Sequence, residues 1–139
     1  MWSDPNHIHK VHDGYTKNSK FVDCNGKRFY LRSSYECICF DYLVYLGYDF
    51  DYECSSFEYY YKGYMRHYVP DFYLKDFNLF LEVKPLKFTT NHKVQAKLNS
   101  VREKGYSIIF ITENELKDLT IFKDTILGST TIQTLLNGQ

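Results

Sequence analysis

Three residues in the middle of the chain, Asp71, Glu82 and Lys84, have side chains suited to chemistry on a phosphate ester. Ten residues separate the two acids, and the lysine follows the second acid by two positions. Two carboxylates a few ångströms apart form a hard-oxygen site that suits Mg²⁺, and a nearby ammonium group can neutralise charge on a bound phosphate. This chemistry requires the flanking sequence to bring the three side chains together.

The flanking residues predict an antiparallel pair of strands joined by a loop of four residues. In that register Leu74 lies opposite Leu79, and Asp71 lies opposite Glu82. Because side chains alternate between the two faces of a strand, one face is then entirely apolar: Phe72, Leu74, Leu79, Leu81 and Val83. The other face holds both acids, with Lys84 about 7 Å further along the strand. Like charges in opposite positions destabilise a strand pair by about 0.2–1 kcal/mol, and a divalent cation removes this conflict.

The composition indicates one compact domain with unevenly distributed charge. Its 139 residues are 44% hydrophobic, which excludes wholesale disorder. No apolar run approaches the roughly 20 residues that span a bilayer. The formal net charge is zero, yet residues 62–104 contain nine Lys and Arg against four Asp and Glu. Such a basic region permits contact with nucleic acid without proving it, and an ordinary exposed polar sheet face remains the alternative for the triplet.

The N-terminal region is polar and lacks the apolar core of a signal peptide. We therefore expect a cytoplasmic protein without membrane contact. We also expect buried free thiols rather than disulfides at the four cysteines, which are Cys24, Cys37, Cys39 and Cys54. Three histidines invite a zinc interpretation, but no convincing fourth ligand lies near them, and a flexible arm is preferred for His7, His9 and His12.

The periodicity of the sequence predicts a mixed α/β domain. Residues 1–20 are expected to be a loose arm, and residues 21–139 are expected to form a single domain. Asn25-Gly26 predicts a hairpin turn, and a helix is expected to begin at a Ser33 cap and end at Gly47. The elements predicted after it are strands at 49–61, 64–74 and 79–84 with a turn at 62–63, a helix at 91–104, a strand at 107–112 and one or two short helices. A central sheet covered by helices is typical of this order.

Four segments resemble motifs of the PD-(D/E)xK nuclease superfamily. They are residues 32–36 (RSSYE), 50–53 (FDYE), 68–72 (YVPDF) and 82–84 (EVK). In order and spacing they are most similar to the phage junction-resolving endonuclease I group. They also resemble transposon end-cleaving subunits and very-short-patch-repair-like homing nucleases. The resemblance covers about residues 30–112 and implies a restriction-endonuclease-like mixed central β-sheet flanked by helices, in αβββαβα order.

The resemblance also implies roles for individual residues. Asp71, Glu82 and the backbone carbonyl of Val83 bind Mg²⁺, for which Mn²⁺ substitutes, and Lys84 is catalytic. Glu36, from the first helix, completes the acidic cluster as a catalytic and metal-binding residue. Glu36 also stands three residues after the expected helix cap, so an ordinary capping role is the alternative.

Contacts with DNA phosphates are expected from two places. Arg32 and Ser33 stand at the start of the first helix, where phosphates bind readily, with ordinary capping as the alternative. Lys93, Lys97 and Lys104 recur on one face of the helix at 91–104, behind the site, with a solvated face as the alternative.

The expected function is a Mg²⁺-dependent DNA endonuclease that leaves 5′-phosphate and 3′-hydroxyl ends. We expect it to process phage or mobile-element DNA, as a branched-DNA resolvase or as a homing or transposition-type nuclease, in the host cytoplasm if a phage encodes it. The alternative is a non-catalytic DNA-binding or assembly subunit that retains the nuclease fold. DNA is the expected partner, and either a homodimer or a partner protein is left open as the source of specificity.

Overall fold

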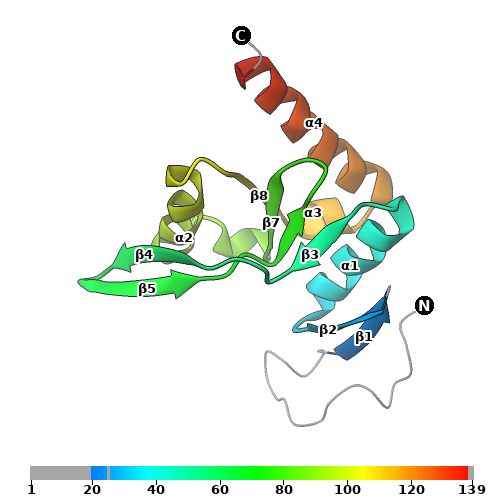
Figure 1. The fold of residues 1–139 in the computed structure, drawn as a ribbon, viewed down its shortest axis with the longest axis horizontal. Coiled ribbons are helices and arrows are strands. Elements are labelled where there is room, and N and C mark those ends of the chain that lie inside the picture. Colours follow the sequence, from blue (N-terminus) through cyan, green and yellow to red (C-terminus); the bar gives the residue numbers. More distant parts are fainter. Residues whose placement is uncertain (1–19, 25, 138–139) are drawn as a thin grey trace.

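The computed structural model describes residues 20–24 and 26–137 and shows a mixed α/β fold (Figure 1). Its central sheet has four strands in the order β3-β6-β7-β8. These strands are β3 (Phe50–Tyr52), β6 (Phe72–Leu74), β7 (Leu79–Val83) and β8 (Ser107–Ile111). β7 pairs antiparallel with β6 and parallel with β8. The sheet is therefore mixed, as the sequence predicted.

Helices cover both faces of this sheet (Figure 1). One face packs through an apolar cluster against α1 (Ser34–Leu46), α3 (Glu113–Leu116) and α4 (Leu119–Asn137). The opposite face packs through a second cluster against α2 (His92–Glu103). α2 lies between β7 and β8 in the chain, after the short 3₁₀ helix Leu86–Phe88, and it provides the crossover that two parallel strands require.

β7 lies at the centre of the fold, and all five of its residues are buried. Leu79 pairs with Leu74, as predicted, and its side chain lies in the cluster beneath α1. Leu81 and Val83 lie in the same cluster, whereas Phe80 lies in the cluster beneath α2. The predicted apolar face is thus confirmed, and the other face of β7 is also covered.

Helix α1 begins and ends where the sequence predicted. Ser33 adopts an extended conformation, and its hydroxyl accepts a 3.2 Å hydrogen bond from the amide of Glu36. Gly47 closes the other end at a φ of 74°, a left-handed conformation that glycine adopts without steric cost. The helix start therefore fixes Glu36 in the first turn, next to the central sheet.

A separate hairpin precedes α1 and consists of β1 (Lys20–Cys24) and β2 (Lys27–Leu31). Cys24 pairs with Lys27, which confirms the position of the predicted turn, and Gly26 has a φ of 79°. Asn25 and residues 1–19, with the three N-terminal histidines, lie outside the described residues. Lys20 belongs to a strand rather than to the predicted arm.

The two long strands predicted at 49–61 and 64–74 are wrong, because each is divided in the structure. Their inner parts, β3 and β6, lie in the central sheet. Their outer parts, β4 (Phe57–Tyr61) and β5 (Tyr64–Tyr68), pair only with each other and form a two-stranded antiparallel ribbon. We call residues 57–68 the β4–β5 ribbon.

Backbone geometry explains the division. The chain leaves the central sheet at Glu53, which has a φ of 50°. It returns through the buried Pro70, which lacks an amide hydrogen and cannot complete a strand ladder. At the far end Lys62 and Gly63 both have positive φ, which confirms the predicted turn.

The C-terminal helix and the cysteines also differ from prediction. α4 spans 19 residues and is not short. All four cysteines are free, as expected, but Cys24 is only half-buried and Cys54 is exposed, so buried thiols are confirmed only for Cys37 and Cys39. Among the helices of the described residues, none has the length and apolar character needed to cross a membrane.

Candidate active site

The β6–β7 hairpin brings Asp71 and Glu82 to the same end of the strand pair. Phe72 pairs with Leu81, as predicted, and Asp71 directly precedes this pair. The Asp71 carboxylate reaches across to β7, where Oδ2 accepts a 2.7 Å hydrogen bond from the amide of Val83. Both acids are buried, with 9% of Asp71 and 6% of Glu82 exposed.

Two neighbours hold the carboxylate of Glu82. Its Oε1 accepts a 2.5 Å hydrogen bond from the hydroxyl of Tyr68, the last residue of β5. Its Oε2 lies 3.7 Å from the Nζ of Lys84, and this lysine side chain is 24% exposed. The two residues of the EVK segment that were predicted to act together are therefore in contact.

Glu36 combines the two roles that the sequence left open. Its amide takes part in the helix cap through Ser33. Its carboxylate does not return to the cap residue, and Oε1 instead accepts hydrogen bonds of 3.0 Å from the amide of Arg32 and 2.6 Å from the hydroxyl of Tyr52. Glu36 is 4% exposed, so it is a third buried acid.

The three buried acids influence one another electrostatically. Burial raises the pKa of Asp71 well above its usual value, and the charges of Glu82 and Glu36 raise it further. Burial also raises the pKa of Glu82, against the opposing effects of Tyr68 and Lys84. Burial likewise raises the pKa of Glu36. The cluster is therefore short of positive charge, which is the condition that a divalent cation relieves.

Lys97 of α2 belongs to this site, and the prediction that it lies behind the site is wrong. Its side chain is half-buried, and its Nζ lies 5.7 Å from the ring centre of Tyr68. Burial and the charge of Lys84 lower its pKa, whereas Glu82 and Asp71 raise it. Two lysines therefore approach the acidic cluster, one from the end of β7 and one from α2.

The other two predicted lysines of α2 differ from each other. Lys93 is half-buried, and its charge acts on Lys97. Lys104 is the exposed residue that closes α2, and it borders an open pocket with Glu58 and His67 of the β4–β5 ribbon. The predicted lysine stripe therefore divides between the acidic site and the base of the ribbon.

Arg32 and Ser33, predicted to contact phosphate, are engaged within the protein. The guanidinium of Arg32 donates hydrogen bonds of 3.0 and 3.2 Å to the two carboxylate oxygens of Glu53, and this contact raises the pKa of the arginine. Ser33 uses its hydroxyl as the helix cap. These contacts fit a structural role for both residues, and their contact with phosphate stays a prediction.

The ligand chemistry of the site fits a hard divalent cation in part. Among the described residues, no three His, Cys, Asp or Glu side chains form a ready metal-holding group. The predicted set of Asp71, Glu82 and the Val83 carbonyl needs only two carboxylates. No described residue donates a hydrogen bond to Asp71 Oδ1 or to Glu36 Oε2, although both acids are buried. Each of these acids thus has one oxygen fixed by the protein and a second that is available to a ligand.

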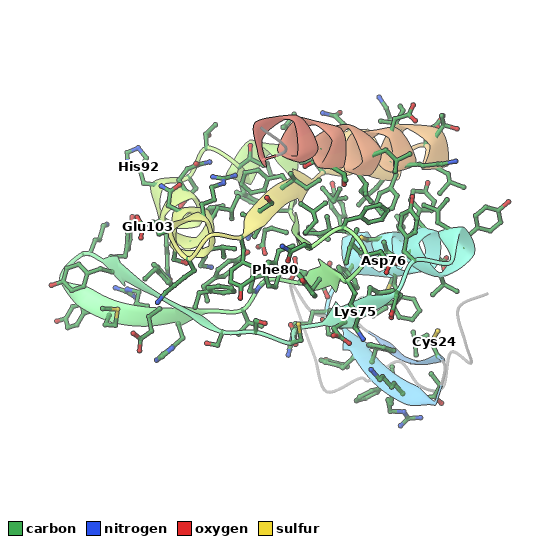
Figure 2. The ribbon with its side chains drawn as sticks, turned by 45° about the horizontal axis from the view of Figure 1, so that its top comes forward. Cys24, Lys75, Asp76, Phe80, His92 and Glu103 are labelled. Atoms are coloured by element: carbon green, nitrogen blue, oxygen red, sulfur yellow. The ribbon has the colours of Figure 1, made fainter. Side chains whose placement is uncertain are left out.

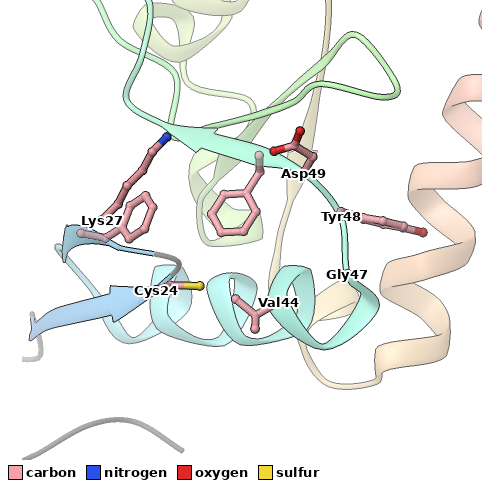
Figure 3. A pocket seen from close by; sticks show the side chains of 8 residues that line it. Cys24, Lys27, Val44, Gly47, Tyr48 and Asp49 are labelled. Carbon is pink, nitrogen blue, oxygen red and sulfur yellow. The ribbon is translucent and has the colours of Figure 1, made fainter.

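A separate pocket of about 510 Å³ lies between the β1–β2 hairpin, the end of α1 and β3 (Figure 3). Its lining includes Cys24, Lys27, Val44, Tyr48 and Asp49. Among the described residues of its lining, none belongs to the acidic cluster and Asp49 is the only acid. We therefore place the candidate active site at the acidic cluster and not at this pocket.

Sequence reasoning missed the two tyrosines that hold the acids. Tyr52 and Tyr68 lie within the segments that resemble nuclease motifs, but nothing in their spacing indicated a contact with Glu36 or Glu82. The available signal was that both tyrosines stand within three residues of an acid in the same segment. Because the chain contains 14 tyrosines, this position did not distinguish them from the others. Comparisons with protein families, with curated proteins and with solved structures found no significant match.

Proposed function

We propose that this protein is a Mg²⁺-dependent DNA endonuclease whose active site contains Asp71, Glu82 and Lys84. The observation that supports this most strongly is the pair of buried acids at one end of the β6–β7 hairpin, with a lysine in contact with one of them. Burial and mutual repulsion penalise the charged forms of these acids, so stability alone does not account for their placement. A cation-dependent reaction does.

The arrangement of elements supports the same proposal. With the β4–β5 ribbon taken as an insertion, α1, β3, β6, β7, α2 and β8 follow one another as helix, three strands, helix and strand. We propose that this unit is a restriction-endonuclease-like core of the PD-(D/E)xK kind. The fold is only an analogy for the chemistry, and the side chains of the site support the assignment of the reaction.

The proposed roles follow from the contacts at the site. Asp71, Glu82 and the Val83 carbonyl hold Mg²⁺, with Glu36 beside them. Bound Mg²⁺ supplies positive charge against the scissile phosphate and increases the acidity of water near it. Hydrolysis forms a P–O bond from water and breaks the bond to the 3′-oxygen, which takes up a proton. The products are a 5′-phosphate and a 3′-hydroxyl.

The two lysines balance charge during this reaction. Lys84 contacts Glu82, and its ammonium group stabilises the negative charge that develops on the phosphate. The Nζ of Lys97 lies 5.7 Å from the ring centre of Tyr68, and its charge offsets that of Glu82. Tyr68 holds Glu82 in one orientation through its hydroxyl. Together these groups oppose the rise in the pKa of Glu82 that burial causes, and Tyr68 holds the carboxylate in position.

Cleavage of supercoiled, branched and linear DNA by the purified chain with Mg²⁺ or Mn²⁺ tests the proposal. Asp71→Asn and Glu82→Gln each remove one charge and retain the shape of the side chain. We expect each to lower the cleavage rate on the order of 10²–10³-fold, the size typical of one lost electrostatic group in an active site. Asp76→Asn and Glu103→Gln, which change exposed acids of the same two types, are matched controls that should retain activity.

Different outcomes separate the alternatives. Cleavage that survives both active-site substitutions would contradict the proposed site. Carboxylate-independent DNA binding without any cleavage would favour a non-catalytic DNA-binding or assembly subunit. Preferential cleavage of four-way junctions by a dimer would identify a resolvase among the proposed nuclease types, whereas a sequence-dependent cut in linear DNA would favour a homing or transposition-type enzyme.

A further inference from the structure

The β4–β5 ribbon has an outer half in which only Tyr61 packs against the core of the protein. Figure 1 shows the ribbon extending from the central sheet to beyond α2, and Figure 2 shows side chains spreading from both of its strands. At its base, Phe57, Tyr59 and Tyr68 pack into the cluster beneath α2. The outer residues 60–66, which we call the tip, contribute no buried side chain.

The tip combines exposed aromatic rings with positive charge. Tyr60 and Tyr64 are 65% and 70% exposed. Lys62 and Arg66 lie beside them, and the tip contains no Asp or Glu. The Arg66 guanidinium lies 5.8 Å from the ring centres of both Tyr61 and Tyr64. These cation–ring contacts hold the positive groups at the exposed end of the ribbon.

This combination of groups fits one class of partner. Large exposed aromatic side chains contribute little to a core and mark a site of interaction. Lysine and arginine attract the phosphates of a polyanion, and tyrosine side chains contact phosphates, sugars and the base edges that a groove exposes. A two-stranded ribbon also fits the major groove of B-DNA, which is about 12 Å wide. The chemistry of the tip is therefore complementary to duplex DNA.

The position of the ribbon connects the tip to the candidate active site. Tyr68 ends β5 and donates its hydroxyl hydrogen to Glu82, and Asp71 follows three residues later. Tyr64 begins β5, so at about 3.3 Å per residue it lies about 13 Å from Tyr68 along the strand. That distance equals roughly four base pairs of B-DNA at about 3.4 Å each.

We propose that the tip of the β4–β5 ribbon binds duplex DNA in the major groove, about four base pairs from the phosphate that the active site attacks. This inference rests on the proposed nuclease function, which supplies the position of the scissile phosphate. Lys62 and Arg66 contact phosphates on the rim of the groove. Tyr60 and Tyr64 lie on opposite faces of the ribbon, because Tyr60 pairs with Met65 and Tyr64 pairs with Tyr61, and they contact base edges and sugars on the two sides of the groove.

Fluorescence anisotropy of a labelled duplex, in EDTA and over a series of salt concentrations, measures binding without metal-dependent cleavage. The pair Lys62→Ala and Arg66→Ala should weaken binding by about tenfold or more and lower the salt slope by about two, since each lost phosphate contact lowers it by about one. The pair Tyr60→Ala and Tyr64→Ala should weaken binding by about tenfold, a size expected when a contact to a base edge is lost.

A matched control uses exposed residues away from the ribbon. Tyr45→Ala on α1 together with Lys123→Ala on α4 removes one exposed ring and one exposed charge, and DNA affinity should stay within about twofold of the wild-type value. Duplexes shortened stepwise on each side of the cleavage position test the geometry. The effect of the tip variants should disappear once one flank is shorter than about four base pairs.

The results distinguish this inference from the proposed function. If the wild-type protein binds no duplex, or if both tip variants retain wild-type affinity and salt slope, the inference is wrong even where Asp71→Asn abolishes cleavage. If the tip variants retain DNA binding but dissociate a dimer in sedimentation, the tip is a subunit contact and the inference is again wrong. Tip-dependent binding without any cleavage supports duplex binding by the tip but refutes the nuclease proposal, and with it the stated distance from a scissile phosphate.

Discussion

Leu81 and Glu82 are neighbours on β7 and both are buried, yet they serve opposite faces of the sheet. Leu81 packs into the apolar cluster beneath α1, where full burial of such a side chain stabilises a fold by about 1.5–3 kcal/mol. Glu82 lies on the α2 face, where burial raises its pKa and two lysines and a tyrosine are needed to offset its charge. One face of the strand is wholly apolar and stabilises the protein, whereas the other combines the apolar Phe80 with a charged group that is buried at a cost.

This difference between the two faces of β7 indicates which part of the fold carries the function. The apolar face needs only side chains of suitable volume, and packing alone accounts for the residues found there. The acidic face contains groups whose charged forms the surrounding protein disfavours, and such groups concentrate at functional sites. The contrast between the two faces can be tested by substitutions at adjacent positions.

The largest expected effect is a difference in stability between two neighbouring substitutions. Leu81→Ala removes a fully buried side chain and should lower the free energy of unfolding by about 2–5 kcal/mol. Glu82→Gln should not lower it, because the substitution removes a buried charge whose pKa is raised. Urea titrations of both variants provide the measurement. A loss in Glu82→Gln as large as that in Leu81→Ala would show that the acid is structural and would remove the contrast.

A smaller effect is expected on the acidic face itself, from Lys97→Met. The methionine retains the apolar stem and removes a charge that lowers the pKa of Glu82. The acidic limb of the pH–rate profile should therefore move to higher pH, and cleavage at neutral pH should fall roughly 10–100-fold, as for loss of a group that supports a metal ligand. Lys123→Met, which changes an exposed lysine of α4, is the matched control and should leave the pH profile unchanged. A uniform loss of DNA affinity with an unchanged pH profile would instead make Lys97 a phosphate contact.

The dependence of stability on pH sharpens the same comparison. In the unfolded chain the pKa values of Asp and Glu are about 3.9 and 4.3. In the metal-free folded protein the pKa values of Asp71 and Glu82 are higher. The contribution of these two acids to the free energy of unfolding is thus most favourable below pH ~4. It is lost as the pH rises through their pKa values in the folded protein. Asp71→Asn removes the Asp71 part of this loss.

The melting temperature of Asp71→Asn minus that of the wild type should therefore increase as the pH rises from about 4 to neutrality, reaching a few degrees, as for roughly 1 kcal/mol in a domain of this size. Effects of pH on groups that do not interact with Asp71 cancel in this difference. Asp76→Asn, at the loop end of the same hairpin, should show a constant difference near zero. A difference that decreases toward neutral pH would contradict the raised pKa of Asp71.

The smallest effect is expected at the start of α1. Ser33→Ala removes the hydroxyl that accepts from the amide of Glu36 and should destabilise the protein by about 1 kcal/mol. Ser33→Asn, which also caps helices, should restore the lost stability. Melting temperature and DNA affinity are measured together. Reduced DNA affinity with unchanged stability in Ser33→Ala would support phosphate contact in place of capping.

The arrangement of the two β7 faces was predictable from sequence because it is a local property. Alternating leucines fixed the register of β6 and β7, and a two-residue period then determined which side chains share a face. The ends of α1 were likewise predictable, since Ser33 and Gly47 act within one turn of the helix. In both cases neighbours in the chain supply the interactions that decide the structure.

The division of the long strands and the full set of site residues were not predictable in this way. Residues on either side of Pro70 alternate like one strand, and only their packing separates a ribbon beneath α2 from the central sheet. Lys97 and Tyr68 meet Glu82 through contacts between α2, β5 and β7. Such contacts depend on the arrangement of elements, which hydrophobic periodicity does not specify.

Calorimetric titration with Mn²⁺ tests most directly whether the acidic face is a metal site. The titration compares the wild-type protein with Asp71→Asn and with the matched control Asp76→Asn, all freed of divalent metal beforehand. We expect the wild type and the control to bind Mn²⁺ alike, and Asp71→Asn to bind it at least about tenfold more weakly, because a ligand carboxylate is lost. Equal binding by all three proteins, or binding by none of them, would contradict the account.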